Sequence, residues 1–425
     1  MFDVEKIVKA KAKDGYKILD RTSVSHELFF VLGKTETVRA TDTAETKVTV
    51  YVNNEDGTLG DSTFPVYASM DEVALNVALD KALSRAKLVH NKPYKLVEGG
   101  KDTFELPSNL KGLDGAEVAK KVADAVFAAD MVNGGSINAL EIFVTESKTR
   151  VRLSTGLDKT QITHKISIEA IPTHTDEKES VELYEWYVVT SLDLDDIKRE
   201  ISEKMREVKA RHEAVKGTPQ TIDVALRPSE IMELAETLTD ELSYGSKFMD
   251  ANAYDIGDDL QDGRTGDPLT ITEKAQVEGG NDSAAFDADG TVLKDRVVIK
   301  DGKVVSLWGT SRYGQYIGVK PEEITGDLGC LSVESGSLEK LEGRYLEAVS
   351  LSGIQLNVYN DYIGGEIRLA YLHDGDKVTP VTGISMSGKL SEVLPSLRLT
   401  NDNAAHGAFN YEGPSRMLLK DMKIV

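Results

Sequence analysis

The sequence predicts an α+β protein made of two halves. Residues 1–217 alternate β-branched stretches with segments whose apolar residues recur every three or four positions, the spacing of amphipathic helices. Residues 218–425 begin with one strand and one helical segment and continue as short strand-like runs separated by glycine. This distribution favours an N-terminal half of mixed helix and strand and a C-terminal half that is mostly antiparallel β. The break Gly217-Thr218-Pro219 places the boundary between the halves after residue 217.

In the first half, three long helices follow from spacing and from end signals. Ser69 as N-cap and Glu72 in a capping box predict a helix over residues 69–89. Two further helices are predicted over residues 114–131 and 193–216, the latter with an acidic first turn and a basic last turn. The apolar face of the first is predicted to comprise Met70, Val73, Ala74, Val77, Ala78, Ala82 and Leu83. A short helix over residues 2–13 and strands over residues 16–19, 27–32, 35–52, 138–145, 150–154, 161–171 and 181–191 complete this half.

In the second half, a strand is predicted over residues 221–226 and an amphipathic helix over residues 229–242. Residues 245–291 combine acids and glycines with few apolar groups, which predicts a long irregular segment. After it, two apolar runs flank Asp301-Gly302, a pair that tolerates the positive φ of a tight hairpin turn.

Composition excludes several classes of protein. A formal charge of −21 repels a phosphate backbone, so we expect no direct binding to nucleic acid. No stretch approaches the roughly 18 apolar residues that span a bilayer, and the charged N-terminal residues do not resemble a signal peptide, so no membrane partner is expected. A single cysteine in 425 residues excludes an intramolecular disulfide and fits a reducing compartment, which predicts a cytoplasmic protein.

The order of short motifs in the second half carries a resemblance. Asp287-Ala288-Asp289-Gly290 is followed by the Asp301-Gly302 hairpin, then by Gly364-Gly365-Glu366, Val378-Thr379-Pro380 and Gly413-Pro414-Ser415. In this order the segments resemble the C-terminal half of the TldD/PmbA proteins. That family is named for modulation of DNA gyrase and is understood as subunits of a zinc metallopeptidase.

The resemblance raises the question of a zinc site, because the catalytic branch of the family carries His-Glu-x-x-x-His on a helix. None of the seven histidines here has a second histidine four or five residues away. The matching helix, residues 229–242, has no histidine and offers Glu233 and Glu236 instead. Where the catalytic branch takes a cysteine ligand near its C terminus, this chain offers His406 and no thiol, while Cys330 lies well before that segment. We therefore predict no catalytic residue, no metal and no cofactor.

The resulting hypothesis is a non-catalytic partner subunit of a peptide-degrading metallopeptidase complex, either a homodimer or a heterodimer with a TldD-type catalytic subunit. Glu233, Glu236, His406, Tyr313 and Tyr316 are candidates for a vestigial site or a peptide groove, and core or edge packing is the favoured role for any one of the tyrosines. Two alternatives remain. A divergent metal site could use His406, Cys330 and the acidic loop 255–267, although such a loop more often only meets solvent. A protein-binding regulator, for example of DNA gyrase, would share the scaffold.

Overall fold

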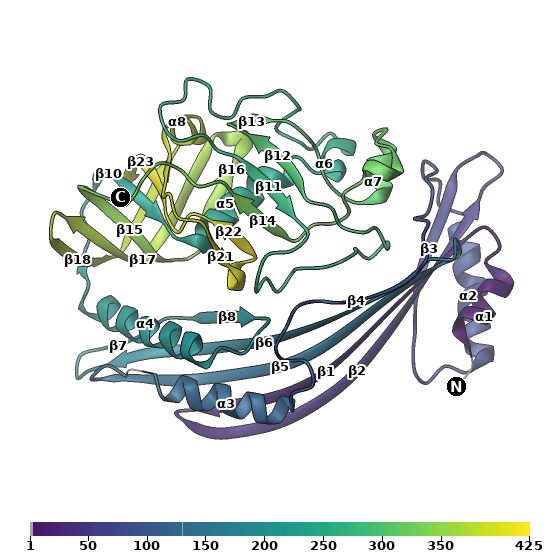
Figure 1. Cartoon of the computed structure of the whole chain (residues 1–425), viewed down its shortest axis with the longest axis horizontal. Coiled ribbons are helices and arrows are strands. Elements are labelled where there is room, and N and C mark those ends of the chain that lie inside the picture. The colour runs from purple at the N-terminus through teal and green to yellow at the C-terminus, as the bar shows by residue number, and fades with distance from the viewer. Residues whose placement is uncertain (1–2, 130) are drawn as a thin grey trace.

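The structure is a computed structural model that describes residues 3–129 and 131–425. Phe2 and Asp130, which fall in two of the predicted helices, lie outside the described residues. The predicted α+β class is confirmed, with helices packed on largely antiparallel sheets (Figure 1). The boundary after residue 217 stays a prediction.

The N-terminal half is built on one eight-stranded sheet in the order β3-β2-β1-β5-β6-β4, with β7 and β8 also paired to β6. Its long strands run the length of this half below the C-terminal half, and α1 and α2 lie at their far end (Figure 1). The strands are β1 (Tyr16–Val31), β2 (Lys34–Asn53), β3 (Leu59–Val66), β4 (Lys101–Glu105), β5 (Gly135–Leu153), β6 (Asp158–Thr175), β7 (Ser180–Glu182) and β8 (Glu185–Val189). The helices are α1 (Val4–Lys11), α2 (Glu72–Ala86), α3 (Gly115–Phe127) and α4 (Leu194–Glu213).

The long strands correct the prediction of shorter ones. Residues 16–19 and 27–32 were predicted as separate strands, yet β1 runs unbroken between them, and β5 likewise joins two predicted strands. The polar stretch in the middle of β1 breaks the apolar alternation, but its backbone is paired on both sides. Arg21, for example, lies opposite Glu45 of β2 and Thr149 of β5. Ladder hydrogen bonds therefore continue the strand where side-chain pattern gives no signal.

Helix α2 also differs from its prediction. Its N-cap is Asp71, whose side chain accepts a hydrogen bond from the Ala74 N–H, and not Ser69. Both residue types suit the position, so sequence preference alone does not separate them. The helix therefore packs with a different face toward the core than the one predicted. Of the residues of the predicted face, only Ala82 is fully buried. Val73 is 71% exposed. The buried residues are Leu75, Leu79, Ala82 and Ala86.

Helices α3 and α4 are confirmed, although α3 ends at Phe127 rather than at residue 131, and the structure shows how each begins. The side chain of Asp114 accepts hydrogen bonds from two N–H groups of the first turn of α3, and Asp193 does the same for α4. Both helices cover one face of the long sheet and share a core with β5 and β6. Helix α4 ends at Glu213 rather than 216, because Val215–Lys216 pairs with β18 as the short strand β9.

The C-terminal half consists of a nine-stranded and a six-stranded sheet. The first sheet holds β9, β10 (Gln220–Leu226), β15 (Arg344–Leu351), β16 (Gln355–Asn357), β17 (Tyr362–Asp374), β18 (Lys377–Thr382), β19 (Ile384–Gly388), β20 (Arg398–Leu399) and β23 (Met417–Ile424). The second holds β11 (Ile271–Lys274), β12 (Arg296–Lys300), β13 (Lys303–Val304), β14 (Cys330–Val333), β21 (Ala404–His406) and β22 (Tyr411–Gly413). The helices are α5 (Pro228–Asp240), α6 (Tyr244–Phe248), α7 (Ser311–Tyr316), α8 (Leu390–Ser396), η1 (Pro321–Glu323), η2 (Val358–Asn360) and η3 (Gly407–Phe409).

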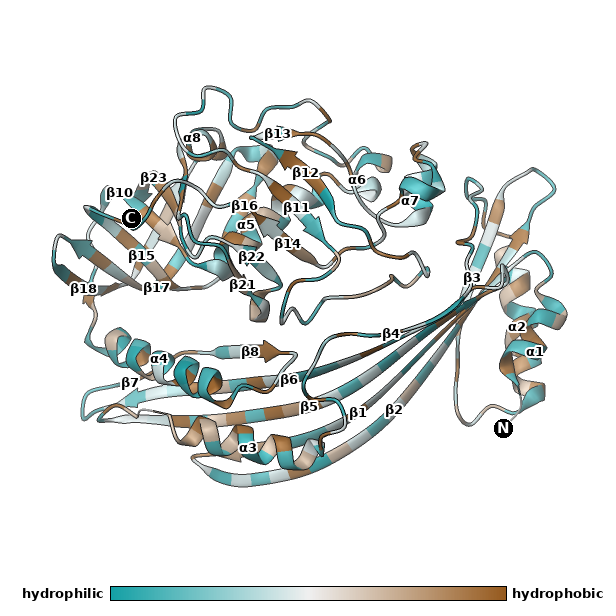
Figure 2. Ribbon diagram, viewed as in Figure 1, coloured by the Kyte–Doolittle hydropathy of each residue, from teal (hydrophilic) through white to brown (hydrophobic). Residues whose placement is uncertain are grey.

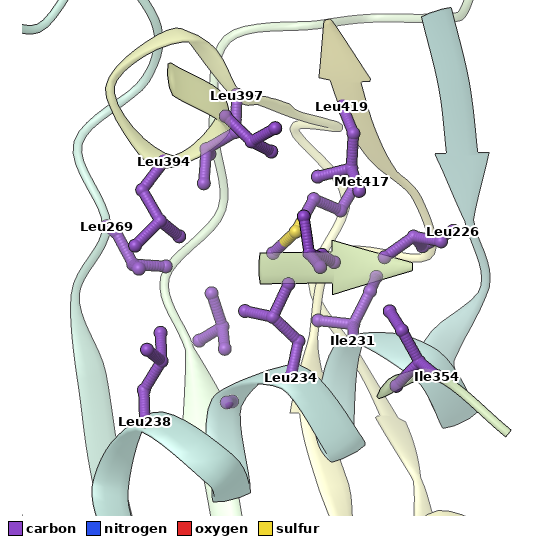
Figure 3. Close-up of a cluster of buried hydrophobic side chains, with 14 of the residues drawn as sticks. Leu226, Ile231, Leu234, Leu238, Leu269, Ile354, Leu394, Leu397, Met417 and Leu419 are labelled. Atoms are coloured by element: carbon purple, nitrogen blue, oxygen red, sulfur yellow. The ribbon is translucent and has the colours of Figure 1, made fainter. Parts of the chain in front are cut away.

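Helix α5 is the centre of the C-terminal core. Leu234 and Leu238 point from it into a cluster that also receives Met417 of β23 together with Leu269 and Leu397, which lie in the segments leading into β11 and β20 (Figure 3). The strands around it carry many hydrophobic residues, whereas the long strands of the other half switch between hydrophilic and hydrophobic residues along their length (Figure 2). The predicted hairpin is confirmed, with φ of 51° at Asp301 and 87° at Gly302. Among the helices of the described chain, none combines the length and apolar character that crossing a bilayer requires.

Candidate functional site

A groove lies where the two halves meet. It consists of two adjoining pockets, one of about 500 Å³ and one of about 600 Å³, which share Thr190, Ser191, Glu278 and Gly279. The first pocket lies between residues 163–165 of β6, residues 106–109 and the loop 276–283 of the C-terminal half. The second lies between α4, β8 and η3. Hydroxyl and amide groups dominate the lining of the first pocket, and charged groups of α4 enter the second.

The motif Asp287-Ala288-Asp289-Gly290 fixes one end of this junction. Asp287 is 8% exposed and accepts hydrogen bonds from the N–H groups of Asp289, Thr291 and Asp327. Burial, and then the charge of Asp289, raises the pKa of Asp287 to about 6. The turn that it holds faces β6, where Lys159 Nζ donates to Gly290 O at 3.0 Å. Residues 287–290, which carry part of the family resemblance, therefore form a turn through which the C-terminal half contacts β6 of the N-terminal half.

A buried charge network fixes the other end. Arg227 before α5 pairs with Glu207 of α4 at 2.6 Å and with Glu347 of β15 at 3.1 Å. Arg416 also bonds Glu347, at 2.8 Å. Burial opposes the charge of Glu347, but the two guanidinium groups outweigh it and hold the pKa of this carboxyl below its usual value. The orientation of α4 over the groove thus depends on matched charges.

The sequence candidates Glu233 and Glu236 both lie on α5, outside the lining of the groove. Glu233 Oε2 accepts a long hydrogen bond of 3.4 Å from the Ile354 N–H, and Glu236 is exposed. Burial raises the pKa of both carboxyls, and neighbouring acids raise that of Glu236 further.

Next to them lies Glu273 of β11, a residue that sequence reasoning missed. It is 2% exposed, and burial together with Asp240, Glu236 and Asp327 raises its pKa to about 8. A carboxyl that keeps its proton near neutral pH can donate it in a hydrogen bond. Nothing in the surrounding Ile-Thr-Glu-Lys sequence distinguishes this glutamate from a surface residue, because its burial arises from the packing of α5 on β11.

His406 is the one sequence candidate that lines the groove. Its ring stacks on Tyr411 at 5.5 Å, and burial lowers its pKa. Its Nε2 is buried without a hydrogen-bond partner in the part of the chain that the structure describes. Glu200 of α4 lines the same pocket, and burial, helped by Glu185, raises its pKa to about 7. Sequence reasoning missed Glu200 because it looks like one more acid on a charged helix.

Tyr313 and Tyr316 lie elsewhere, in an aromatic cluster with Phe248 and Tyr94. The ring of Tyr316 is 4.9 Å from that of Phe248 and 6.0 Å from that of Tyr94, and Arg312 lies over both tyrosines of α7. Tyr316 is 6% exposed. These rings join α7 to the N-terminal half and do not line the groove.

The remaining candidates for a metal site are also apart. Cys330 is buried 3.6 Å from the Ser283 hydroxyl, and burial raises its pKa to about 11. In the acidic loop, Asp267 is 6% exposed and holds Ser337 and Arg398, whereas Asp255 is exposed and pairs with Lys247. Over residues 3–129 and 131–425, no three His, Cys, Asp or Glu side chains converge in a way that could hold a metal ion.

Comparison with known proteins places this arrangement in context. Residues 219–425 match the family described as the PmbA/TldA metallopeptidase C-terminal domain. A comparison with curated protein sequences finds no match.

Three solved structures share the fold over essentially their whole length. TldE from Thermococcus kodakarensis superposes with a TM-score of 0.81 at 15% identity, covering 100% of both chains. A protein from Thermotoga maritima named as a DNA gyrase modulator gives 0.76 at 16% identity, covering 99% of each chain. One of the same name from Bacteroides thetaiotaomicron gives 0.80 at 14% identity, covering 100% of this chain and 99% of that one. Residues 219–425 therefore belong to the PmbA/TldA metallopeptidase C-terminal domain family, and the whole chain shares its fold with these three structures.

Proposed function

We propose that this chain is a non-catalytic partner subunit of a peptide-degrading metallopeptidase complex. The observation that carries the proposal is the chemistry of α5, the helix that resemblance matches to the zinc helix of the catalytic branch. It offers Glu233, Glu236 and Asp240 and no imidazole or thiolate. Zinc sites that activate water take three protein ligands, commonly including histidine, and leave one position open. The residues present on α5 do not fit such an ion.

The groove supports a role in holding or enclosing peptide. Its first pocket is lined by Ser147, Thr163, Ser191 and Asn281, which can bond a polar main chain without demanding a particular side chain. The fold shared with TldE from Thermococcus kodakarensis agrees with the partner type that the resemblance implies. The partner is either a second copy or a TldD-type catalytic subunit.

A reconstitution experiment tests the proposal. The purified chain is assayed for bound metal by mass spectrometry and for hydrolysis of a fluorogenic peptide mixture, alone and with the TldD-type subunit of the same organism. We expect no stoichiometric zinc and no hydrolysis alone, and hydrolysis with the partner at a rate above that of the partner alone. Zinc bound one to one by this chain and lost in His406→Ala would establish the divergent metallopeptidase instead.

A regulator that acts without a peptidase is the remaining candidate, favoured only by the gyrase-modulator names of two similar structures. It predicts that the chain alone binds gyrase subunits in a pull-down with purified proteins. The charge of −21 makes direct binding to the DNA itself an improbable route to such an effect.

A further inference from the structure

A second, smaller pocket lies inside the N-terminal half, between the long sheet and the start of α3. It encloses about 190 Å³. All of its lining residues come from β1, β5, β6 and the segment 110–118, so the C-terminal half takes no part in it. We call it the α3 pocket.

The walls of the α3 pocket are mostly apolar. Leu110, Val118 and Val144 line it and are buried in the core that the sheet shares with α3. Val24 and Leu113 also line it but are 44% and 50% exposed, so they form its rim. An apolar occupant would remove these two side chains from water, which is favourable in proportion to the area covered. The walls therefore favour a ligand that is mostly hydrocarbon.

The side chain of His164 faces this pocket and not the groove between the halves. Successive side chains of a strand point to opposite faces of the sheet. Those of Thr163 and Lys165 lie on the groove side, so that of His164 lies on the side of α3. On the same face, Glu146 of β5 lies opposite His164, and Ile166 packs in the core with α3. The His164 side chain is only 6% exposed.

The ring of His164 has an unmet hydrogen-bond requirement. Its Nε2 lies 3.2 Å from Glu146 Oε2, and its Nδ1 is buried without a hydrogen-bond partner in the part of the chain that the structure describes. A carboxylate oxygen only accepts, so in the neutral ring Nε2 carries the proton and Nδ1 is an acceptor. Buried polar atoms in folded proteins nearly always have a partner. The α3 pocket thus offers one buried acceptor among apolar walls.

The volume of the α3 pocket limits the size of its occupant. An apolar cavity of about 150 Å³ is large enough to bind benzene, so about 190 Å³ holds one six-membered ring with a small substituent. Pockets for drug-sized ligands begin at roughly 300 Å³. The space cannot extend past the start of α3, because a Cβ on Gly115 would lie 2.4 Å from Cδ2 of His26. An extended peptide or a long acyl chain therefore does not fit.

We propose that the α3 pocket binds a small neutral ring compound with one hydroxyl group, about the size of phenol. The ring lies against Leu110, Val118 and Val144, and the hydroxyl donates to Nδ1 of His164. An anionic ligand is disfavoured, because it lacks the proton that Nδ1 requires and would place a second negative charge close to Glu146. The site lies outside the groove and does not depend on the proposed function.

Fluorine NMR with two matched probes tests this site on the full chain. 4-Fluorophenol carries the hydroxyl, and 4-fluorotoluene carries in its place a methyl group of similar size that cannot donate. At pH 8, on the alkaline side of the range in which histidine ordinarily titrates, we expect saturable binding of 4-fluorophenol. Its affinity should be at least about fivefold higher than that of 4-fluorotoluene, which leaves Nδ1 unpaired. Equal affinities, or no saturable binding of either probe, overturn the proposal.

Three variants locate the binding in the α3 pocket. His164→Phe keeps a ring but removes the acceptor, so the two affinities should come within about twofold of each other. Val24→Trp fills the pocket from its exposed rim and should abolish binding of both probes, whereas Val24→Ala should keep the parental preference. Each variant should show the parental thermal transition. An undiminished preference in folded His164→Phe, or binding that persists in folded Val24→Trp, overturns the site.

Discussion

The two halves of the molecule hold their sheets together in different ways. In the N-terminal half, four strands of 16 to 20 residues form the body of the eight-stranded sheet. Residues 34–45 of β2 have almost no buried side chains. In the C-terminal half, the longest strand has 13 residues, and two sheets close around α5. The comparison teaches that the exposed part of the long sheet in the first half depends on its strand ladders, whereas the second half depends on burial around α5 throughout. Four substitutions, in order of decreasing effect, probe this difference.

Arg227→Ala should have the largest effect, because it removes the cation that joins α4 to the C-terminal half. Glu207 would keep Lys204 and Glu347 would keep Arg416, but both would lose the cation that they share across the halves, which costs up to about 3 kcal/mol, the lower end of the range for breaking a buried pair. We expect calorimetry to show the N-terminal half unfolding separately at lower temperature. Arg199→Ala is the control on the same helix, since Arg199 is exposed and pairs only with Asp196 among the described residues, and should cost under about 1 kcal/mol. A single cooperative transition for Arg227→Ala would show that the halves do not depend on this network.

Glu273→Gln should stabilise the C-terminal half at neutral and alkaline pH. The folded protein holds the Glu273 proton up to a pKa of about 8, above the model value of 4.5, so between these values the unfolded state binds fewer protons. Stability of the parent therefore falls as pH rises through this range. At about 1.4 kcal/mol per pKa unit, the loss at pH 8 is on the order of a few kcal/mol.

The measurement for Glu273→Gln is urea unfolding at pH 5 and pH 8. The variant should match the parent at pH 5 and exceed it at pH 8. Glu339→Gln, at an exposed acid of the same half that is not among the groups raising the pKa of Glu273, serves as control with a change within about 0.5 kcal/mol. A parent whose stability does not decline between the two pH values would contradict the buried, protonated state of Glu273.

Asp193→Ala should cost about 1 kcal/mol, because its side chain accepts from the N–H groups of Asp195 and Asp196 at the start of α4. The loss should fall on the N-terminal half. Asp195→Ala, in the same first turn but without a cap bond, should cost a few tenths of a kcal/mol. Chemical denaturation followed by circular dichroism measures the free energy of unfolding of both variants. Equal losses of stability would show that the Asp193 cap does not stabilise this half.

Val38→Ala should have the smallest effect. Val38 is 69% exposed on the part of β2 that lacks buried side chains, so its truncation should change the free energy of unfolding by less than about 0.5 kcal/mol. Urea titration at two protein concentrations measures the change. A loss above 1 kcal/mol that grows with protein concentration would mean that another molecule covers this strand in solution.

The sequence was sufficient to predict those elements that are determined by residues close together in the chain. The Asp301-Gly302 hairpin was found because turn preferences act within a few residues. Helix α3 was found from the spacing of its apolar residues, and helix α4 from its acidic first turn and basic last turn. The N-cap of α2 was missed because Ser69 and Asp71 both suit that position, and the choice between them is made by packing of Leu75 and Leu79. The prediction from apolar alternation also divided the long strands, because backbone hydrogen bonds to neighbouring strands continue them through polar stretches that show no such alternation.

The candidate site was only partly within reach of sequence. His406 was identified and does line the groove, but Glu200 and Glu273 gain their character from burial by elements distant in the chain. The interval of β6 between its pairings with β4 and β8, residues 163–165 at the wall of the groove, could not be predicted at all, because it depends on where two other strands stop. Positions of free backbone groups are properties of the assembled sheet rather than of any residue type.

The buried thiol of Cys330 has a practical consequence for studying motion between the halves. Its sulfur is enclosed, and its pKa of about 11 keeps it protonated at neutral pH, where only thiolates react readily with maleimides. Because no other cysteine is present, a dye pair attached at two engineered surface cysteines would report distance changes without background labelling. The native chain is thus already a suitable template for fluorescence measurements of groove opening.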